Sequence, residues 1–102
     1  MERIKPLSDF FAAIENDARI SITHIGIYAA LLHYWQLYGC QNPLCAYSYE
    51  IMRIAKISAP ATYHKTVKEL NDYGYIQYEP SFKRNQSSKV HLLLVQNRSF
   101  KD

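Results

Sequence analysis

The chain has 102 residues, of which 48% are hydrophobic and 21% are charged, and its net charge is +3. This length fits one small domain, and the hydrophobic fraction is enough to build a core, which argues against a disordered segment. No apolar run approaches the roughly 20 residues of a membrane span, and the first residues lack the apolar stretch of a secretory signal. We therefore expect a cytoplasmic protein with no membrane partner.

The first predicted element is a short N-terminal helix over residues 7–17. Phe10, Phe11 and Ile14 form an apolar stripe on it, and Ser8 is a plausible N-cap. We expect a homodimer, and this helix is its natural contact element. The alternative is that the helix covers the core of its own chain.

A long helix is predicted over residues 21–38, with Ser21 or Thr23 as its N-cap and Gly39 as its stop. Its apolar residues cover more than one narrow stripe. The pattern therefore predicts a central helix that is buried on two sides.

The middle of the chain predicts a loop, a very short strand at Leu44–Ala46 and a helix over residues 48–56 with Ser48 as its N-cap. Cys40 and Cys45 flank the loop. We interpret them as reduced thiols, because a zinc site needs more ligands than this spacing offers. No metal and no cofactor is expected.

The helix predicted over residues 59–73 carries the functional prediction. Pro60 suits its first turn, and Gly74 ends it. Helical spacing places one set of residues against the core and another set on the opposite, outward face. The first set is Tyr63, Thr66, Val67 and Leu70; the second is Ala61, Thr62, Lys65, Lys68 and Glu69.

A β-hairpin is predicted over residues 75–95, where the sequence changes to a period of two. The polar loop between its strands contains Lys83 and Arg84. Residues 56–102 hold eight Lys or Arg and four acidic residues, whereas residues 1–55 hold four and five. This uneven charge is a weak indication of a polyanionic partner.

The segment 46–95 resembles the winged helix-turn-helix family. The turn IAKIS joins two helices, and SAPATYHKTVKELNDYGYI is similar to a recognition helix with its exit into the wing strand. The whole chain, including FFAAIENDARISITHIGIYAALLHYWQLYG, is similar to a group of small bacterial regulators often associated with mobile elements. The resemblance implies a mainly α fold with a small β-hairpin (α+β), a winged helix-turn-helix with an extra N-terminal helix. It also implies double-stranded DNA as the partner and transcription regulation as the function.

In such a protein the N-terminal part of the second helix enters the major groove deepest. The base-edge candidates are therefore Ser58, Ala59, Pro60 and Thr62. Family members often carry a long polar or basic residue near Pro60, and its absence here weakens base readout at that position. The candidates for phosphate contacts are Lys65, Lys68, Lys83, Arg84 and Lys89.

Two other functions fit the sequence. An accessory replication or mobilisation protein of a mobile element would bind origin or transfer DNA with the same fold. A winged helix can also serve as a protein-interaction module without nucleic acid. No phosphate-binding glycine loop or catalytic motif is recognisable, so we expect neither an enzyme nor a small-molecule ligand.

Overall fold

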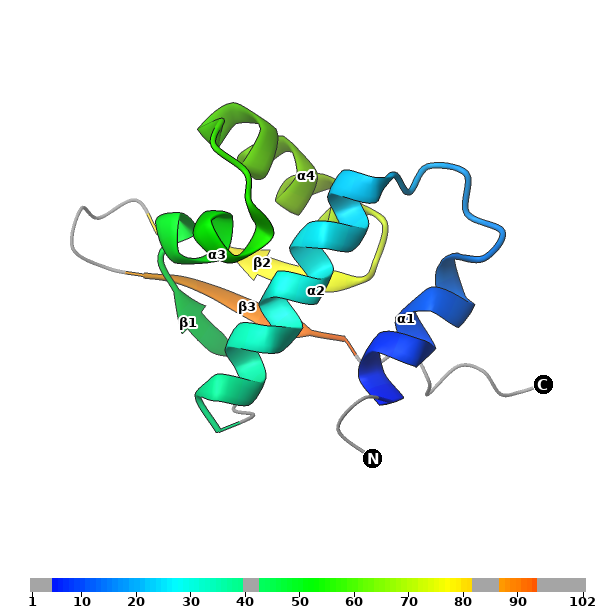
Figure 1. Ribbon diagram of the computed structural model, residues 1–102, viewed down its shortest axis with the longest axis horizontal. Coiled ribbons are helices and arrows are strands. Elements are labelled where there is room, and N and C mark those ends of the chain that lie inside the picture. The colour runs from blue at the N-terminus through cyan, green and yellow to red at the C-terminus, as the bar shows by residue number, and fades with distance from the viewer. Residues whose placement is uncertain (1–4, 40–42, 82–86, 94–102) are drawn as a thin grey trace.

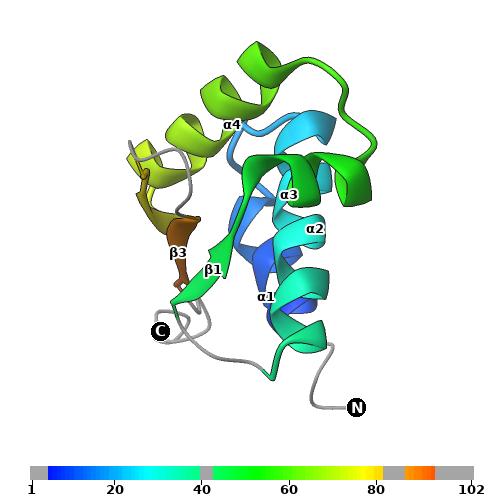
Figure 2. The same ribbon diagram turned by 90° about the vertical axis from the view of Figure 1, so that its left-hand side faces the viewer.

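The computed structural model describes residues 5–39, 43–81 and 87–93. These residues form four helices and a small three-stranded antiparallel sheet, which is a mixed α+β fold. Figure 2 shows α1 and α2 on one side of the sheet, with α4 above it. The helices are α1 (Lys5–Ile14), α2 (Ile22–Leu37), α3 (Ser48–Ala55) and α4 (Pro60–Asp72), and the strands are β1 (Leu44–Ala46), β2 (Ile76–Glu79) and β3 (Ser88–Leu92).

The sheet has β3 in its centre, with β1 and β2 as its edges. Lys89 of β3 lies opposite Cys45 of β1 on one side and Glu79 of β2 on the other. The predicted hairpin is present as β2 and β3, with shorter strands than expected, and the short strand at Leu44–Ala46 is present as β1. The tip of the hairpin (82–86) and residues 94 and 95 lie outside the described residues. The sequence pattern did not indicate that β1 pairs with β3.

The helix α2 runs through the middle of the molecule, between α3 and α1 (Figure 1). Its residues Ile27, Tyr28 and Leu31 are at most 1% exposed. The ring of Phe10 in α1 stacks on that of Tyr28, with 3.9 Å between the ring centroids, and Phe10 itself is fully buried. Phe10 therefore belongs to the core of its own chain. Phe11, its neighbour, is 46% exposed.

The start of α1 differs from the prediction. The helix begins at Lys5 and ends at Ile14, so Ser8 is an internal residue and not the N-cap. Pro6 falls in the first turn, where a proline costs no hydrogen bond. After the helix, the Asp17 carboxylate accepts the backbone N–H of Arg19, which fixes a turn where the prediction continued the helix.

The N-cap of α3 is also corrected. Tyr47 occupies the cap position, and Ser48 is the first helical residue. The carboxylate of Glu50 reaches back and accepts the backbone N–H of Tyr47 at 3.0 Å. This contact satisfies one of the free donors at the start of the helix. For α2, Ser21 and not Thr23 is the N-cap.

Three helices end at residues with left-handed backbone. Gly39 follows α2 with φ +87°, and Gly74 follows α4 with φ +91°, as their sequence positions predicted. Lys56 ends α3 with φ +64° and is the only non-glycine residue with positive φ in the described ranges. A lysine pays a steric cost there that glycine avoids, because its Cβ approaches the carbonyl oxygen.

Each edge strand of the sheet has a backbone group that bonds to a helix side chain. The amide oxygen of Asn71 in α4 accepts the N–H of Tyr78 in β2 at 2.9 Å. The hydroxyl of Tyr34 in α2 donates to the carbonyl of Cys45 in β1 at 3.3 Å. No helix in the described ranges has the length and apolar character needed to cross a membrane.

Candidate nucleic-acid interface

The inner face of α4 is buried as the helical spacing predicted. Tyr63, Thr66, Val67 and Leu70 are at most 5% exposed. Burial raises the pKa of Tyr63, because the phenolate would lose its hydration. Burying large side chains of this kind contributes about 1.5–3 kcal/mol each, so α4 is held firmly against the rest of the fold.

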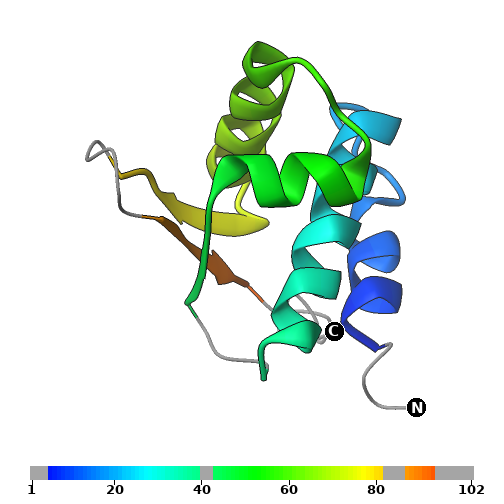
Figure 3. The same ribbon diagram turned by 60° about the vertical axis from the view of Figure 1, so that its left-hand side comes forward.

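The first turn of α4 projects from the molecule. Figure 3 shows it at the top, and it also lies at the top of the molecule in Figures 1 and 2. Its N-cap, Ala59, makes no side-chain hydrogen bond to the turn, and Pro60 is the first helical residue. All four base-edge candidates are exposed, and so is Ala61 between them; none of the five has a bulky side chain (Ser58, Ala59, Pro60, Ala61 and Thr62).

The two lysines of α4 are exposed but paired with acids on the same helix. Lys65 Nζ lies 2.8 Å from Glu69 Oε2, and Lys68 Nζ lies 3.7 Å from Asp72 Oδ2. The hydrogen bond to Glu69 raises the pKa of Lys65, which keeps its positive charge. The acids offset the lysine charges on this part of α4, so a phosphate must compete with them.

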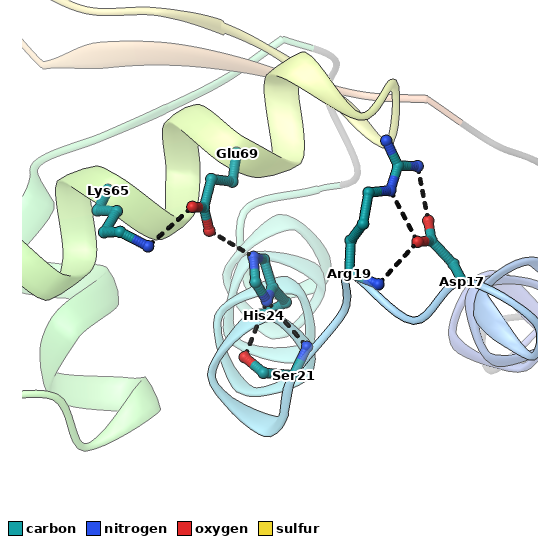
Figure 4. A network of polar contacts seen from close by, with 6 residues as sticks. All are labelled: Asp17, Arg19, Ser21, His24, Lys65 and Glu69. Atoms are coloured by element: carbon teal, nitrogen blue, oxygen red, sulfur yellow. Dashed lines mark hydrogen bonds and ion pairs between the residues drawn. The ribbon is translucent and has the colours of Figure 1, made fainter.

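Glu69 does not face away from the fold, which corrects the prediction. Its carboxylate contacts His24 in the first turn of α2 (Figure 4). The backbone N–H of Ser21 donates to His24 Nδ1 at 3.0 Å, so Nδ1 is the acceptor and Nε2 carries the proton. Nε2 then donates to Glu69 Oε1 at 2.8 Å. The hydrogen bonds from Lys65 and from His24 lower the pKa of Glu69.

A second polar cluster holds the loop between α1 and α2 against the end of α4. Arg19 forms two side-chain hydrogen bonds of 2.8 Å with Asp17 (Figure 4), and the hydroxyl of Tyr75 donates to the same carboxylate at 2.6 Å. The Arg19 guanidinium also lies 4.1 Å from the ring centre of Tyr73. Arg19 and then Tyr75 hold the pKa of Asp17 well below its usual range. Together with His24–Glu69, this cluster fixes α4 at two points.

Of the three remaining phosphate candidates, the structure describes Lys89 alone. Lys83 and Arg84 lie outside the described residues. Lys89 is exposed on β3, and it alternates with Val90, which is buried under the helices. Because successive side chains of a strand point to opposite faces, Lys89 lies on the sheet face away from the helices.

Two basic residues near α4 were missed by the sequence reasoning. Arg53 in α3 and Lys56 at the C-cap of that helix are exposed, and neither forms an ion pair within the part of the chain that the structure describes. With Tyr49, which is 61% exposed, they follow the spacing i, i+4, i+7 and form one stripe, here called the α3 stripe. In Figure 3 the end of α3 leads into the loop that rises to the first turn of α4. This spacing was readable in the sequence.

In the described ranges, no three His, Cys, Asp or Glu side chains gather closely enough to hold a metal ion. Comparisons of the chain with known protein families, with curated proteins and with solved structures find no match.

Proposed function

We propose that this protein binds double-stranded DNA through α4, as a transcriptional regulator of the winged helix-turn-helix class. The order α2–β1–α3–α4–β2–β3, with β1 beside β3, supports that class. The observation that carries the proposal is the first turn of α4. It is exposed and has no bulky side chain before Tyr63, while the opposite face of the same helix is buried.

In the proposed complex the first turn of α4 lies in the major groove. Ala59 and Pro60 allow close approach, and Thr62 supplies a hydroxyl for a base edge and a methyl group for thymine. Because no side chain caps α4, the N–H groups of its first turn are available to a phosphate oxygen. Contacts to the DNA phosphate backbone then set the position of the protein along the duplex.

The α3 stripe supplies phosphate contacts in addition to those of the α4 lysines. Arg53 and Lys56 are not offset by acids in the described ranges, whereas Lys65 and Lys68 are. If about four phosphates are neutralised by the α3 stripe, the α4 lysines and the hairpin loop, log K falls with log salt at a slope near −4.

The test is selection of bound fragments from random duplex DNA, followed by gel shifts at low salt. We expect a preferred sequence, and we expect the double change Arg53→Glu, Lys56→Glu to weaken its binding by about tenfold or more. The matched change Lys89→Glu, on the opposite sheet face, should weaken it less. Retention of no fragment, or binding that survives the double change together with Lys65→Glu, would refute the proposal.

The same selection separates the alternatives. A preferred site in an origin or transfer region would indicate an accessory replication or mobilisation protein. A complete lack of DNA retention would favour a protein-interaction module. The observation that supports this alternative is the pairing of the α4 lysines with Glu69 and Asp72.

A further inference from the structure

The helix α2 has an exposed stripe that the described part of the chain leaves uncovered. Its 16 residues contain no Lys, Arg, Asp or Glu. A helix that is uncharged on all sides is normally buried on all sides. Ile22 is nevertheless 84% exposed and Leu37 62% exposed. The residues between them on this side are Gly26 and Ala29, which are half-buried, and His33, which is exposed; these five residues are here called the α2 stripe.

Among the described residues, no atom lies over the α2 stripe at Gly26. A Cβ added at Gly26 would meet no atom within 4 Å. In Figure 1, α2 crosses the molecule between α3 and α1, with the sheet behind it in this view. From Ile22 to Leu37 the stripe is about 22 Å long, at 1.5 Å per residue.

We propose that the α2 stripe is the contact surface for a second copy of this chain, packed antiparallel across a two-fold axis beside Ala29. In an antiparallel pair centred there, Ile22 of one copy lies opposite Leu37 of the other, and Gly26 lies opposite His33. Large residues thus meet at both ends, and each imidazole ring fills the space left by a glycine.

The stripe matches itself better in this orientation than in the parallel one. A parallel pair would place every residue against its own copy, so two His33 rings would collide while two Gly26 positions left a gap. The lack of charge also suits a second copy, because an apolar surface of the same kind meets no unpaired charge and no like-charge repulsion. This contact replaces α1 as the expected dimer element, since Phe10 is buried in its own core.

One helix pair buries less than the about 800 Å² per partner of a standard interface. We therefore expect a dimer that dissociates at micromolar concentrations. Sedimentation equilibrium of the full chain, from about 1 to 300 μM, should show this transition. A chain that stays monomeric over the whole range would overturn the proposal.

Site-directed changes locate the contact. Ala29→Glu puts a charge at the centre of the α2 stripe and should raise the dimer Kd by at least about tenfold. The matched change Ala12→Glu, at an exposed position of α1, should leave the Kd unchanged. A dimer that survives Ala29→Glu, or one that is lost with Ala12→Glu instead, would refute the α2 contact. Far-UV circular dichroism checks that each variant is folded.

The antiparallel register has its own test. Ile22→Lys and Leu37→Glu should each weaken the dimer, and the two changes in one chain should restore it, because they bring opposite charges together across the axis. If the double variant stays as weak as either single variant, the register is wrong. None of these positions lies on α4 or the α3 stripe, so failure of the dimer and failure of DNA binding remain distinguishable.

Discussion

His24 of α2 and Glu69 of α4 are joined by a hydrogen bond of 2.8 Å, although 45 residues separate them in the chain. The other carboxylate oxygen of Glu69 bonds to Lys65. One acidic group thus connects the first turn of the central helix to a cation on the proposed DNA-binding helix.

The first prediction concerns the pH dependence of this link. Lys65 and His24 lower the pKa of Glu69 from 4.5, so the folded state favours the carboxylate. Its stabilising contribution is therefore present above the unfolded pKa and is lost as the pH falls through the lower folded pKa. Glu69→Gln should lower the free energy of unfolding at neutral pH and reduce its loss between about pH 5 and pH 3. Urea unfolding at stepped pH measures both effects.

The control for that experiment is Glu15→Gln, in the exposed turn after α1. It should keep the wild-type pH dependence. Asp17, whose pKa is also lowered, contributes in both variants to the loss of unfolding free energy at low pH. If Glu69→Gln loses as much stability in acid as the wild type, the link to His24 and Lys65 has no role in it.

The second prediction tests how α1 is attached. Phe10 is fully buried and stacked on Tyr28, so Phe10→Ala should lower the free energy of unfolding by about 3–5 kcal/mol. Phe11→Ala, at the half-exposed neighbouring position, should cost less than about 1 kcal/mol. Urea titrations of the two variants give the comparison. Equal costs would mean that α1 does not pack as described.

The third prediction uses the missing cap of α4. Ala59→Asp gives the first turn a side-chain acceptor and should raise the free energy of unfolding by about 0.5–2 kcal/mol. The same carboxylate would face phosphates, so DNA binding should weaken by about tenfold or more. Ala59→Ser is the matched control: it adds the cap without the charge, so it occupies one N–H group that a phosphate could use and should weaken DNA binding less than Ala59→Asp. Unchanged affinity in the aspartate variant would exclude this turn from the interface.

The fourth prediction concerns Lys56, whose φ of +64° is costly for a lysine. Lys56→Gly should stabilise the fold by about 1 kcal/mol, because glycine adopts this conformation freely. It should also weaken DNA binding and reduce the salt slope by about 1, since one phosphate contact is lost. Lys56→Arg keeps the charge and should keep the affinity. Gel shifts at several salt concentrations measure the slope of log K against log salt. A glycine variant with the wild-type slope would show that Lys56 makes no phosphate contact.

The sequence was most informative for helix ends and for the buried face of α4, which depend on the positions of single residues. Gly39 and Gly74 end their helices as expected, because few other residues adopt positive φ at low cost. The buried face of α4 followed from helical spacing alone. Thr62, on the opposite face, is exposed for the same reason.

Contacts between distant segments could not be predicted in this way. Helical spacing assigns Glu69 to a face, but it does not say that His24 lies beside that face. The strand β1 has only three residues, too few for a period of two to indicate its partner. The ion pairs of Lys65 and Lys68 and the α3 stripe, in contrast, follow i, i+4 spacing and were within reach of the sequence.

The side chains of Asn71 and Tyr34 have a consequence for how this protein behaves at high concentration. Each occupies a backbone group on one outer strand, at Tyr78 and at Cys45, so neither border of the sheet offers an unbroken row of donors and acceptors to a neighbouring molecule. Growth of the sheet into fibres is thereby hindered from both directions. At high concentration we therefore expect the chains to associate through their helices.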